Sequence, residues 1–256
     1  MNWLKQTPDS PLFPDVLWNR PENRRHAGKL LIIGGHAQSF SAVSEAYGAA
    51  QKAGAGTVRV LVPQKLQPTL KTIFPEADYA ASNDIGSFSR QALAEFLEAS
   101  EWADAVLLAG DFGRNSETAL LLEDFLKKYA GKLALTGDSL DYFMNNPRAV
   151  TSRPNTLIIA ALSQLQKLAA PHLIQQNADL AQVAEQLAGW ASSDNLLIIT
   201  VHSGQIIIAG GSRVSTTPSV LSWPVPDLAS LGAVWWLQQP EKPFEALTTA
   251  AHCLGL

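Results

Sequence analysis

The chain repeats one order of segments: a short apolar run is followed by a longer segment with helical spacing. The first apolar run is Leu30–Ile33, and it ends at Gly34-Gly35. A run of this length, closed by glycines, is typical of a strand that is buried on both faces. Strands that alternate with helices pair in parallel, because each connection crosses back over the sheet. The order therefore predicts an α/β fold with one mostly parallel sheet and helices on both faces.

The same order sets the individual elements that we expect. Strands are predicted at residues 30–33, 57–62, 105–109, 133–136 and 149–151. Helices are predicted at residues 41–53, 88–100, 117–129, 155–169, 180–191, 227–239 and 244–254, with Asn155 as the cap of the fourth. Residues 196–199 and 205–209 flank Ser203-Gly204, which predicts an antiparallel hairpin. Residues 1–28 show no sustained period, so we divide the chain into an N-terminal arm (1–28) and a single α/β domain (29–256).

Composition excludes several classes of protein. Hydrophobic residues make up 46% of the chain and charged residues 16%, which is enough apolar material for a two-sided core. The net charge of -4 and the scattered Lys and Arg residues leave no basic patch for nucleic acid or anionic lipid. Cys253 is the single cysteine, which rules out an internal disulfide and a cysteine-based zinc site. We expect a cytoplasmic protein with small-molecule ligands and neither a membrane segment nor a metal site.

The candidate site lies in the loops that follow the apolar runs, because open parallel sheets bind ligands beyond the carboxyl ends of their strands. These loops are residues 34–41, 110–114, 137–139, 152–155 and 224–227. Some of these residues also have a purely structural explanation. Gly34-Gly35 can supply the positive φ of a tight turn. Residues 110–114 can form a solvated turn with an ion pair between Asp111 and Arg114.

Four polar residues of these loops and of the predicted hairpin have two interpretations. Asp138 follows a strand, and its position favours a helix N-cap over ligand binding. His36 and His202 lack metal-ligand spacing, so we interpret them as loop histidines. Asp227 opens a predicted helix, where its carboxylate can interact with free N–H groups. The same carboxylate can instead take a proton from a substrate hydroxyl.

The order of these motifs resembles a known family. The similarity is strongest in residues 28–35, Gly-Lys-Leu-Leu-Ile-Ile-Gly-Gly, and 53–60, Ala-Gly-Ala-Gly-Thr-Val-Arg-Val, with weaker collinear matches at residues 109–114, 135–140, 150–154 and 243–246. The chain resembles the ADP- or ATP-dependent NAD(P)H-hydrate dehydratases of the ribokinase-like superfamily. The resemblance implies a three-layer α/β/α sandwich. It also implies a hydro-lyase that uses ADP or ATP, with or without Mg²⁺, to phosphorylate hydrated NADH or NADPH, after which phosphate leaves.

The resemblance also implies roles for individual residues. Asp227 keeps the position of the catalytic base. The nucleotide-binding residues it implies are Asp111, Phe112, Gly113, Arg114, Asp138, Arg153 and His202. The substrate-binding residues it implies are Gly34, Gly35, His36, Ser39 and Ser41. A homo-oligomer is also implied.

Several loops depart from the family's motifs. The family's Gly-Thr-Gly-Asp is Pro224-Val225-Pro226-Asp227 here, and the two prolines remove N–H donors that a phosphate nest needs. Residues 153–156 replace His-Pro-Gly-Glu, and Val201-His202 replaces Lys-Gly. Asp111 stands in a glycine position of Gly-Pro-Gly-Leu-Gly. We therefore expect a dehydratase-family protein whose activity is reduced or lost.

Two alternatives remain open at this point. The first is a non-catalytic protein that binds a nucleotide or dinucleotide, or assembles with other proteins, on the same fold. The second is a ribokinase-like small-molecule kinase, which would also need a glycine-rich anion hole ahead of its base. Substitution of Asp227 separates catalysis from binding, because dinucleotide binding survives that change in a binding protein.

Overall fold

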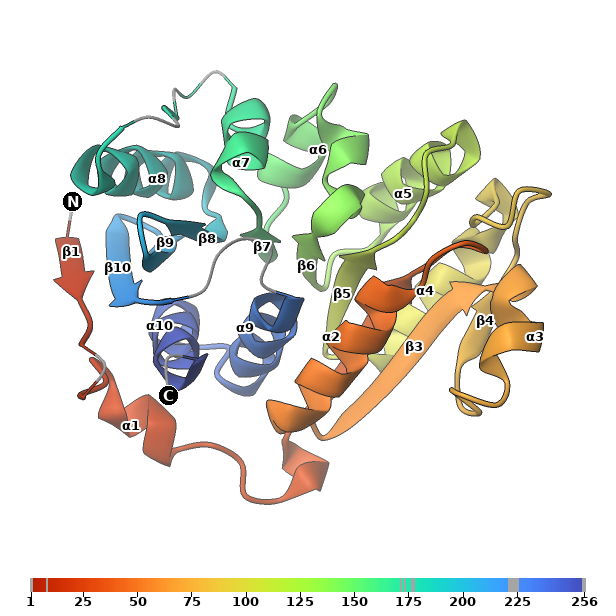
Figure 1. Ribbon diagram of the computed structural model, residues 1–256, viewed down its shortest axis with the longest axis horizontal. Helices are drawn as coiled ribbons and strands as arrows, with labels where there is room; N and C mark the ends of the chain where they lie inside the picture. Colours follow the sequence, from red (N-terminus) through yellow and green to blue (C-terminus); the bar gives the residue numbers. More distant parts are fainter. Residues whose placement is uncertain are drawn as a thin grey trace.

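The computed structural model describes residues 2–7, 9–170, 172, 174–175, 178–220 and 226–254. Within these residues ten strands form one sheet in the order β1-β10-β9-β8-β7-β6-β5-β2-β3-β4 (Figure 1). The strands are β1 (Asn2–Lys5), β2 (Lys29–Gly34), β3 (Thr57–Pro63), β4 (Asp78–Ala80), β5 (Ala105–Gly110), β6 (Lys132–Thr136), β7 (Thr156–Ile159), β8 (Leu197–His202), β9 (Gln205–Gly210) and β10 (Arg213–Pro218). The strands from β2 to β8 pair in parallel, whereas β9 is antiparallel to β8 and β10. The predicted hairpin is confirmed as β8 and β9.

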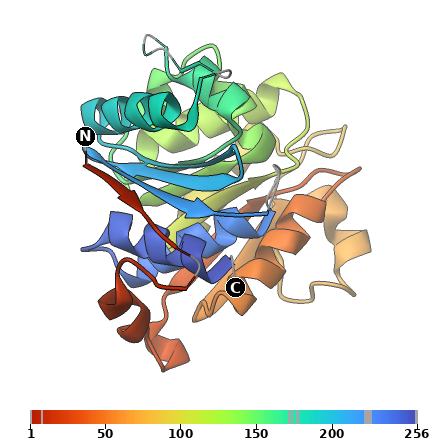
Figure 2. The same cartoon turned by 60° about the vertical axis from the view of Figure 1, so that its left-hand side comes forward.

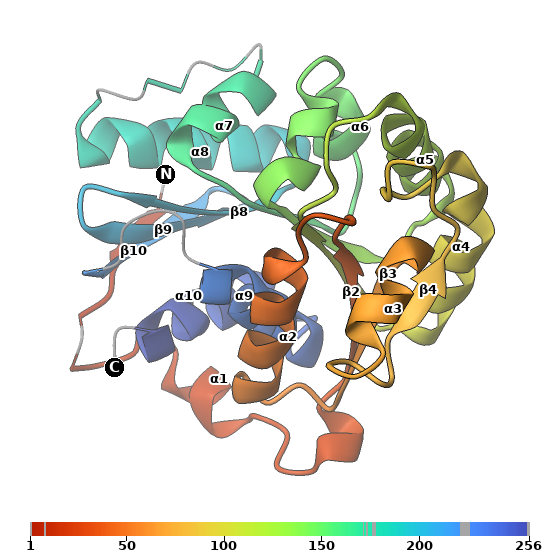
Figure 3. The ribbon, with the colours of Figure 1, turned by 45° about the vertical axis from the view of Figure 1, so that its right-hand side comes forward.

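Helices cover both faces of the sheet. They are α1 (Pro14–Trp18), α2 (Ser41–Lys52), α3 (Gln67–Leu70), α4 (Leu93–Trp102), α5 (Ser116–Lys128), α6 (Arg148–Thr151), α7 (Leu162–Leu168), α8 (Leu180–Asp194), α9 (Pro226–Gln238) and α10 (Pro243–Leu254). Figures 2 and 3 show α2, α9 and α10 on one face, and α4 to α8 on the other. The predicted three-layer α/β/α sandwich is confirmed.

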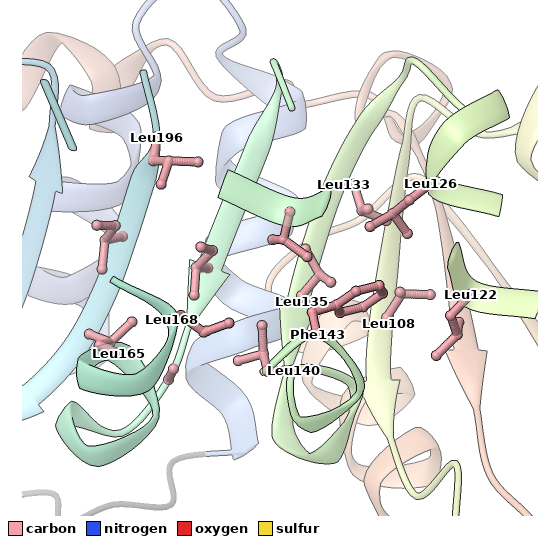
Figure 4. Packing of buried hydrophobic residues seen from close by; sticks show 14 of the residues in the cluster. Leu108, Leu122, Leu126, Leu133, Leu135, Leu140, Phe143, Leu165, Leu168 and Leu196 are labelled. Carbon is pink, nitrogen blue, oxygen red and sulfur yellow. The ribbon is translucent and has the colours of Figure 1, made fainter. Parts of the chain in front are cut away.

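Side chains of each central strand alternate between two cores. Leu30 and Ile32 belong to the cluster that α2 and α9 cover. Leu31 and Ile33 belong to the cluster on the other face, part of which Figure 4 shows. Since successive side chains of a strand point to opposite faces, a continuous apolar run fits a strand with a helix on each side. This burial explains why the first apolar run predicts its strand correctly.

The predictions for residues 149–151 and 155–169 are wrong. The expected strand is the helix α6, and the expected helix begins instead with the strand β7, followed by α7. All residues of β7 are buried, and the strand pairs with β6 and β8. Asn155 does not cap a helix, because it has a φ of 54° and its carbonyl accepts the N–H of Leu133. Its loop therefore precedes a strand and lies at the amino edge of the sheet.

The predicted arm contributes a strand that its sequence does not indicate. β1 pairs in parallel with β10 at one end of the sheet. The indole of Trp3 donates to the hydroxyl of Thr216 at 3.1 Å. The pairing of β1 is set by contacts with residues far along the chain, so local periodicity cannot predict it. Within the described ranges, no helix combines the length and the apolar character that crossing a bilayer requires.

We predict that Gly34→Ala lowers the free energy of unfolding by about 1–3 kcal/mol. A Cβ at residue 34 would lie 2.3 Å from the carbonyl oxygen of Gly110, so the edges of β2 and β5 would have to separate. Gly48→Ala is the matched control, because a Cβ there meets nothing within 4 Å. In the middle of α2 it is expected to stabilise by up to about 1 kcal/mol. Denaturant unfolding measures both, and equal stability of Gly34→Ala and wild type would contradict the prediction.

Candidate functional site

Three parallel strands end side by side at the carboxyl edge of the sheet. β2 ends at Gly34, β5 at Gly110 and β6 at Thr136. The loops that follow are joined by hydrogen bonds: Gly35 N donates to Gly110 O at 3.0 Å, and Phe112 N donates to Asp138 Oδ1 at 3.3 Å. The structure thus brings three of the predicted loops together.

Asp111 connects its loop to α2 and to His36. Asp111 Oδ2 accepts a hydrogen bond from Ala42 N at 2.8 Å and one from the Ser41 hydroxyl at 3.3 Å. His36 Nδ1 lies 2.8 Å from the Asp111 carbonyl and donates to it, because a carbonyl can only accept. The salt bridges between described residues do not include one from Asp111 to Arg114. The carboxylate therefore contacts a helix N-terminus rather than the neighbouring arginine.

Asp138 is not the cap that its position favours. Its carboxylate accepts the N–H of Phe112 in the loop after β5, and the short helical turn that contains it has no side-chain cap. Burial raises the pKa of Asp138, and the charges of Asp111 and Asp141 act in the same direction. The backbone N–H groups of Phe112 and Gly113 oppose that rise in the pKa. Asp138 therefore holds two loops together and is partly withdrawn from water.

The raised pKa of Asp138 predicts a pH-dependent stability. The ordinary pKa of an aspartate, 3.8, applies to the unfolded chain, so folding favours the protonated form of Asp138. That contribution is fully present below pH 3.8 and is lost as the pH rises through the folded pKa. We therefore predict that Asp138→Asn, which keeps an acceptor for Phe112, melts at a higher temperature than wild type at neutral pH. The difference should shrink as the pH falls through the folded pKa toward 3.8, and an unchanged difference over that range would contradict the prediction.

A cavity of about 490 Å³ opens between the loops that follow β5 and β6. Its walls include predicted nucleotide-binding residues, Gly113, Arg114 and Asp138, together with Asp141, Tyr142 and Lys167. The Tyr142 hydroxyl donates to the Gly113 carbonyl, and burial raises the pKa of Tyr142 to about 12. Asp138 and Asp141 offer acceptors for hydroxyl groups, and the exposed cations Arg114 and Lys167 can face anionic groups. The cavity can therefore take a polar small molecule.

Sequence reasoning missed the contribution of Asp141, Tyr142 and Lys167 to this cavity. Lys167 lies on α7. The predicted helix begins at residue 155, too early, and so it does not place Lys167 beyond the carboxyl edge of the sheet. The usable signal was the apolar run at residues 156–159, which has the same form as Leu30–Ile33. Phe112 was predicted as a ligand contact, but its ring is fully buried and packs against Phe88. Only its backbone N–H takes part in the arrangement of the loops.

The predicted substrate residues lie in the turn after β2 and at the start of α2, where His36 and Ser41 contact Asp111. A second hollow of about 410 Å³ is lined by Ser39, Ser41 and their neighbours at the start of α2. His36 and Ser39 form an antiparallel bridge that closes the turn after Gly34 and Gly35. This turn supports the hollow, and it places Ser41 against Asp111.

Asp227 lies at the start of α9, which runs beside α2. Ser230 Oγ donates to Ala46 O and Gln238 Nε2 to Gly54 O, each at 2.9 Å and each across 184 residues. The constant separation shows that the two helices run in the same direction and in register. The first turn of α9 is therefore level with the first turn of α2, and Asp227 is exposed there. Pro224 and Val225 lie outside the described residues.

Arg153 lies at the opposite edge of the sheet, so its predicted position is wrong. It is 8% exposed, and its guanidinium donates to the carbonyls of Tyr129, Gly131, Pro154 and Asn155. Tyr129 and Gly131 precede β6. Pro154 and Asn155 precede β7, because residues 156–159 form a strand rather than a helix. Arg153 has a structural role there.

His202 ends β8, at the carboxyl edge but away from the other candidate residues. Its Nε2 donates to the Ala178 carbonyl at 3.2 Å. The strands β6 and β7 separate it from β5, a distance of roughly 15 Å at ordinary strand spacing. A contact from His202 to a ligand in the cavity described above would need an elongated ligand.

Comparisons with known proteins agree with this architecture. No family model matches the chain. It is 32% identical over 118 residues to a bifunctional NAD(P)H-hydrate repair enzyme of Dictyoglomus turgidum, covering 45% of this chain and 23% of the relative. It is 24% identical over 202 residues to the enzyme of the same name from Moorella thermoacetica, covering 77% of this chain and 34% of the relative. The chain thus spans about a third or less of these curated relatives.

Solved structures cover nearly the whole chain. A ribokinase-like superfamily protein from Enterococcus faecalis superposes with a TM-score of 0.73 at 18% identity, covering 98% of this chain and 86% of that chain. The protein therefore has the ribokinase-like fold. An ADP/ATP-dependent NAD(P)H-hydrate dehydratase from Bacillus subtilis, co-crystallised with ATP/Mg²⁺, superposes with a TM-score of 0.66 at 16% identity, covering 96% and 87%. Within this fold class, the resemblance to the NAD(P)H-hydrate dehydratases is confirmed.

Proposed function

We propose that the protein is a nucleotide-dependent NAD(P)H-hydrate dehydratase with low turnover. The observation that carries the proposal is that the start of α9, with Asp227, is level with the start of α2. Both helix starts lie at the edge where the loops of Asp111 and Asp138 meet. A ligand at this edge can therefore meet an exposed carboxylate and the two cavities at once. Sequence similarity to the hydrate repair enzymes supports this substrate class.

The proposed reaction begins at Asp227. Its carboxylate takes the proton from the hydroxyl of the hydrated nicotinamide ring while that oxygen attacks the terminal phosphorus of ADP or ATP. Phosphorylation replaces hydroxide, a poor leaving group, by phosphate. Loss of phosphate and of a proton from the neighbouring carbon then restores the ring double bond. The products are NADH or NADPH, inorganic phosphate and the shortened nucleotide.

A metal ion that accompanies the nucleotide would be held mainly by phosphate groups. Among the described residues, no three histidine, cysteine or acidic side chains gather closely enough to hold an ion. Mg²⁺ commonly binds with few protein carboxylates and several phosphate oxygens, so this arrangement suits such an ion. Asp138 and Asp141 are the carboxylates that line the 490 Å³ cavity and would contribute to holding the ion.

We propose low turnover because of two prolines in the loop before Asp227. Pro224 and Pro226 stand where the resembling family has glycines, and proline offers no N–H to a phosphate oxygen. Loss of one such donor in an anion hole costs about 10²–10³ in rate. The family resemblance further supports a homo-oligomer, and the single cysteine supports a cytoplasmic location.

The test is a repair assay with wild-type protein, NADH hydrate and either ADP or ATP. Recovery of NADH absorbance that requires the added nucleotide, with one phosphate released per NADH, supports the proposal. The same mixture without nucleotide is the control. Binding of NADH without any recovery would favour the non-catalytic alternative. Phosphate transfer to a product that keeps the phosphate would favour a small-molecule kinase.

A further inference from the structure

A third cavity, of about 440 Å³, opens at the amino edge of the sheet, opposite the candidate site. We call it the amino-edge cavity. It lies where β6, β7 and β8 begin, and the end of α9 and the start of α10 also line it. Lys132 begins β6 at this edge, and Thr136 ends the strand at the other edge, about 13 Å away at the ordinary rise of a strand. Buried strands fill the space between the two edges, so a molecule in this cavity is separate from a ligand of the candidate site.

The floor of the amino-edge cavity is apolar. Its side chains include Leu196, Trp236 and Phe244, which are 1%, 3% and 1% exposed. Trp236 belongs to the last turn of α9, and Phe244 to the first turn of α10. An aromatic ring or a hydrocarbon chain is stabilised when it leaves water for such a surface. The floor therefore favours an apolar part of a ligand.

The charged side chains of the cavity wall are two cations, Lys132 and Arg213. In the part of the chain that the structure describes, no acidic side chain lines the cavity. The ammonium of Lys132 also forms no ion pair with another described residue. The whole chain has a net charge of -4, so a wall with cations alone runs against its composition. Such a wall attracts an anionic group.

Arg213 is held in place with one edge of its guanidinium unbonded. Its Nη1 donates to the Glu245 carboxylate, and its Cζ lies 4.4 Å from the centroid of the Phe244 ring. Within the described ranges, Nε and Nη2 have no hydrogen-bond partner. Two adjacent N–H groups of a guanidinium bind a carboxylate through two parallel hydrogen bonds. Glu245 offsets one of the two positive charges, so the charge that remains, that of Lys132, matches a single carboxylate.

Two asparagines at the rim add unused polar groups. Asn155 and Asn195 lie in the turns before β7 and β8, and each has a φ of 54°. Their side-chain amides form no hydrogen bond with other residues that the structure describes. The loop of Asn155 is fixed by Arg153, whose Nη1 donates to the Asn155 carbonyl at 3.2 Å. The rim therefore offers donors and acceptors on well-held turns.

We propose that the amino-edge cavity is a second binding site, which takes a small molecule with one carboxylate and an aromatic or aliphatic body. The carboxylate lies against Arg213 and Lys132, and the body lies on the floor beside Trp236. This site goes beyond the proposed function and does not depend on it, because no residue of the candidate site takes part.

The test titrates the full chain with cinnamate, an aromatic carboxylate, and with cinnamamide, its uncharged counterpart, by calorimetry. Cinnamate is expected to bind wild type about tenfold more tightly, because charge-assisted hydrogen bonds are the stronger ones. Lys132→Met keeps the apolar stem, and Arg213→Lys keeps a charge for Glu245 without the fork. Each is expected to weaken cinnamate binding by about tenfold and to leave cinnamamide binding unchanged. Lys71→Met removes an exposed lysine after α3, beside β4 at one end of the sheet, and should bind cinnamate like wild type (Figure 1).

The indole N–H signals of the seven tryptophans in a ¹⁵N–¹H NMR spectrum locate the bound probe. The signal of Trp236 is identified by its absence in Trp236→Phe. Cinnamate is expected to shift this signal and to leave that of Trp18, an exposed residue of α1, in place.

No binding of cinnamate, equal affinity for both probes, or unchanged affinity in Lys132→Met would overturn the inference. So would binding that leaves the Trp236 signal in place, because the probe then lies elsewhere. Lys132 is partly exposed at the start of a strand, so Lys132→Met is expected to fold, and its result stands even if Arg213→Lys unfolds. Failure of the hydrate repair assay would count against the proposed function alone, because cinnamate binding is measured without nucleotide or hydrate.

Discussion

Asp227→Asn is expected to lower the rate of nucleotide-dependent NADH-hydrate dehydration by about 10²–10⁴-fold. The asparagine has nearly the same shape but cannot take a proton from the substrate hydroxyl. Because the exposed side chain starts a helix beside α2, the change should leave the fold and ligand binding intact. The effect should therefore fall on kcat, with KM changed little. Steady-state repair kinetics measure both constants.

A matched control is available just beyond the same helix. Glu241 is also an exposed acid, and it follows the end of α9 instead of its start. Glu241→Gln therefore removes one negative charge far from the candidate site, and its repair rate should equal that of wild type. Repair by Asp227→Asn at the wild-type rate would remove Asp227 from the proposed mechanism.

Arg153→Met is expected to lower the free energy of unfolding by about 1–3 kcal/mol for each buried carbonyl that loses its donor. The guanidinium donates to backbone carbonyls in the two loops that precede β6 and β7, including Tyr129 O at 2.7 Å. Methionine fills similar space but removes the guanidinium donor of the Tyr129 and Gly131 carbonyls, and buried polar groups without partners are costly. Urea unfolding measures the loss.

Two comparisons make this second result specific. Arg148→Met changes an exposed arginine on α6, and its stability should stay within about 0.5 kcal/mol of wild type. ADP affinity of folded Arg153→Met should equal that of wild type, because Arg153 lies at the edge opposite the candidate site. A large loss of ADP affinity with normal stability would support the nucleotide-binding role that the family resemblance implies for Arg153.

The wrong prediction at β7 shows that local sequence patterns cannot always distinguish a strand from a helix. Residues 156–159, Thr-Leu-Ile-Ile, are as apolar and β-branched as the run that forms β2. The preceding Pro154-Asn155 has the form of a helix start, and the following residues have helical spacing, so local signals favour a helix. Residues 156–159 form a strand because they are buried between β6 and β8, and that burial depends on strands 20 to 40 residues away. Tertiary packing overrides local preference here.

For the candidate site, the sequence indicates which loops matter but not what their side chains contact. The positions of Gly34, Asp111 and Asp138 after apolar runs correctly predict one shared edge. The role of each carboxylate depends on which N–H groups the folded loops bring within reach. Asp111 meets Ala42, 69 residues away, and Asp138 meets Phe112, 26 residues away. Neither pairing leaves a trace in local spacing.

The pairing of β1 with β10 has a consequence for how the chain folds. Trp3 and its partner Thr216 are 213 residues apart, and Gln6 also bonds to Thr217 and to the Thr248 carbonyl. During synthesis, residues 2–5 have no strand to pair with until β10 has left the ribosome. Contacts of such long sequence separation form late and slow the final step of folding. Residues 2–5 are therefore among the last parts of the sheet to be placed, and until then the outer edge of β10 stays open to other chains.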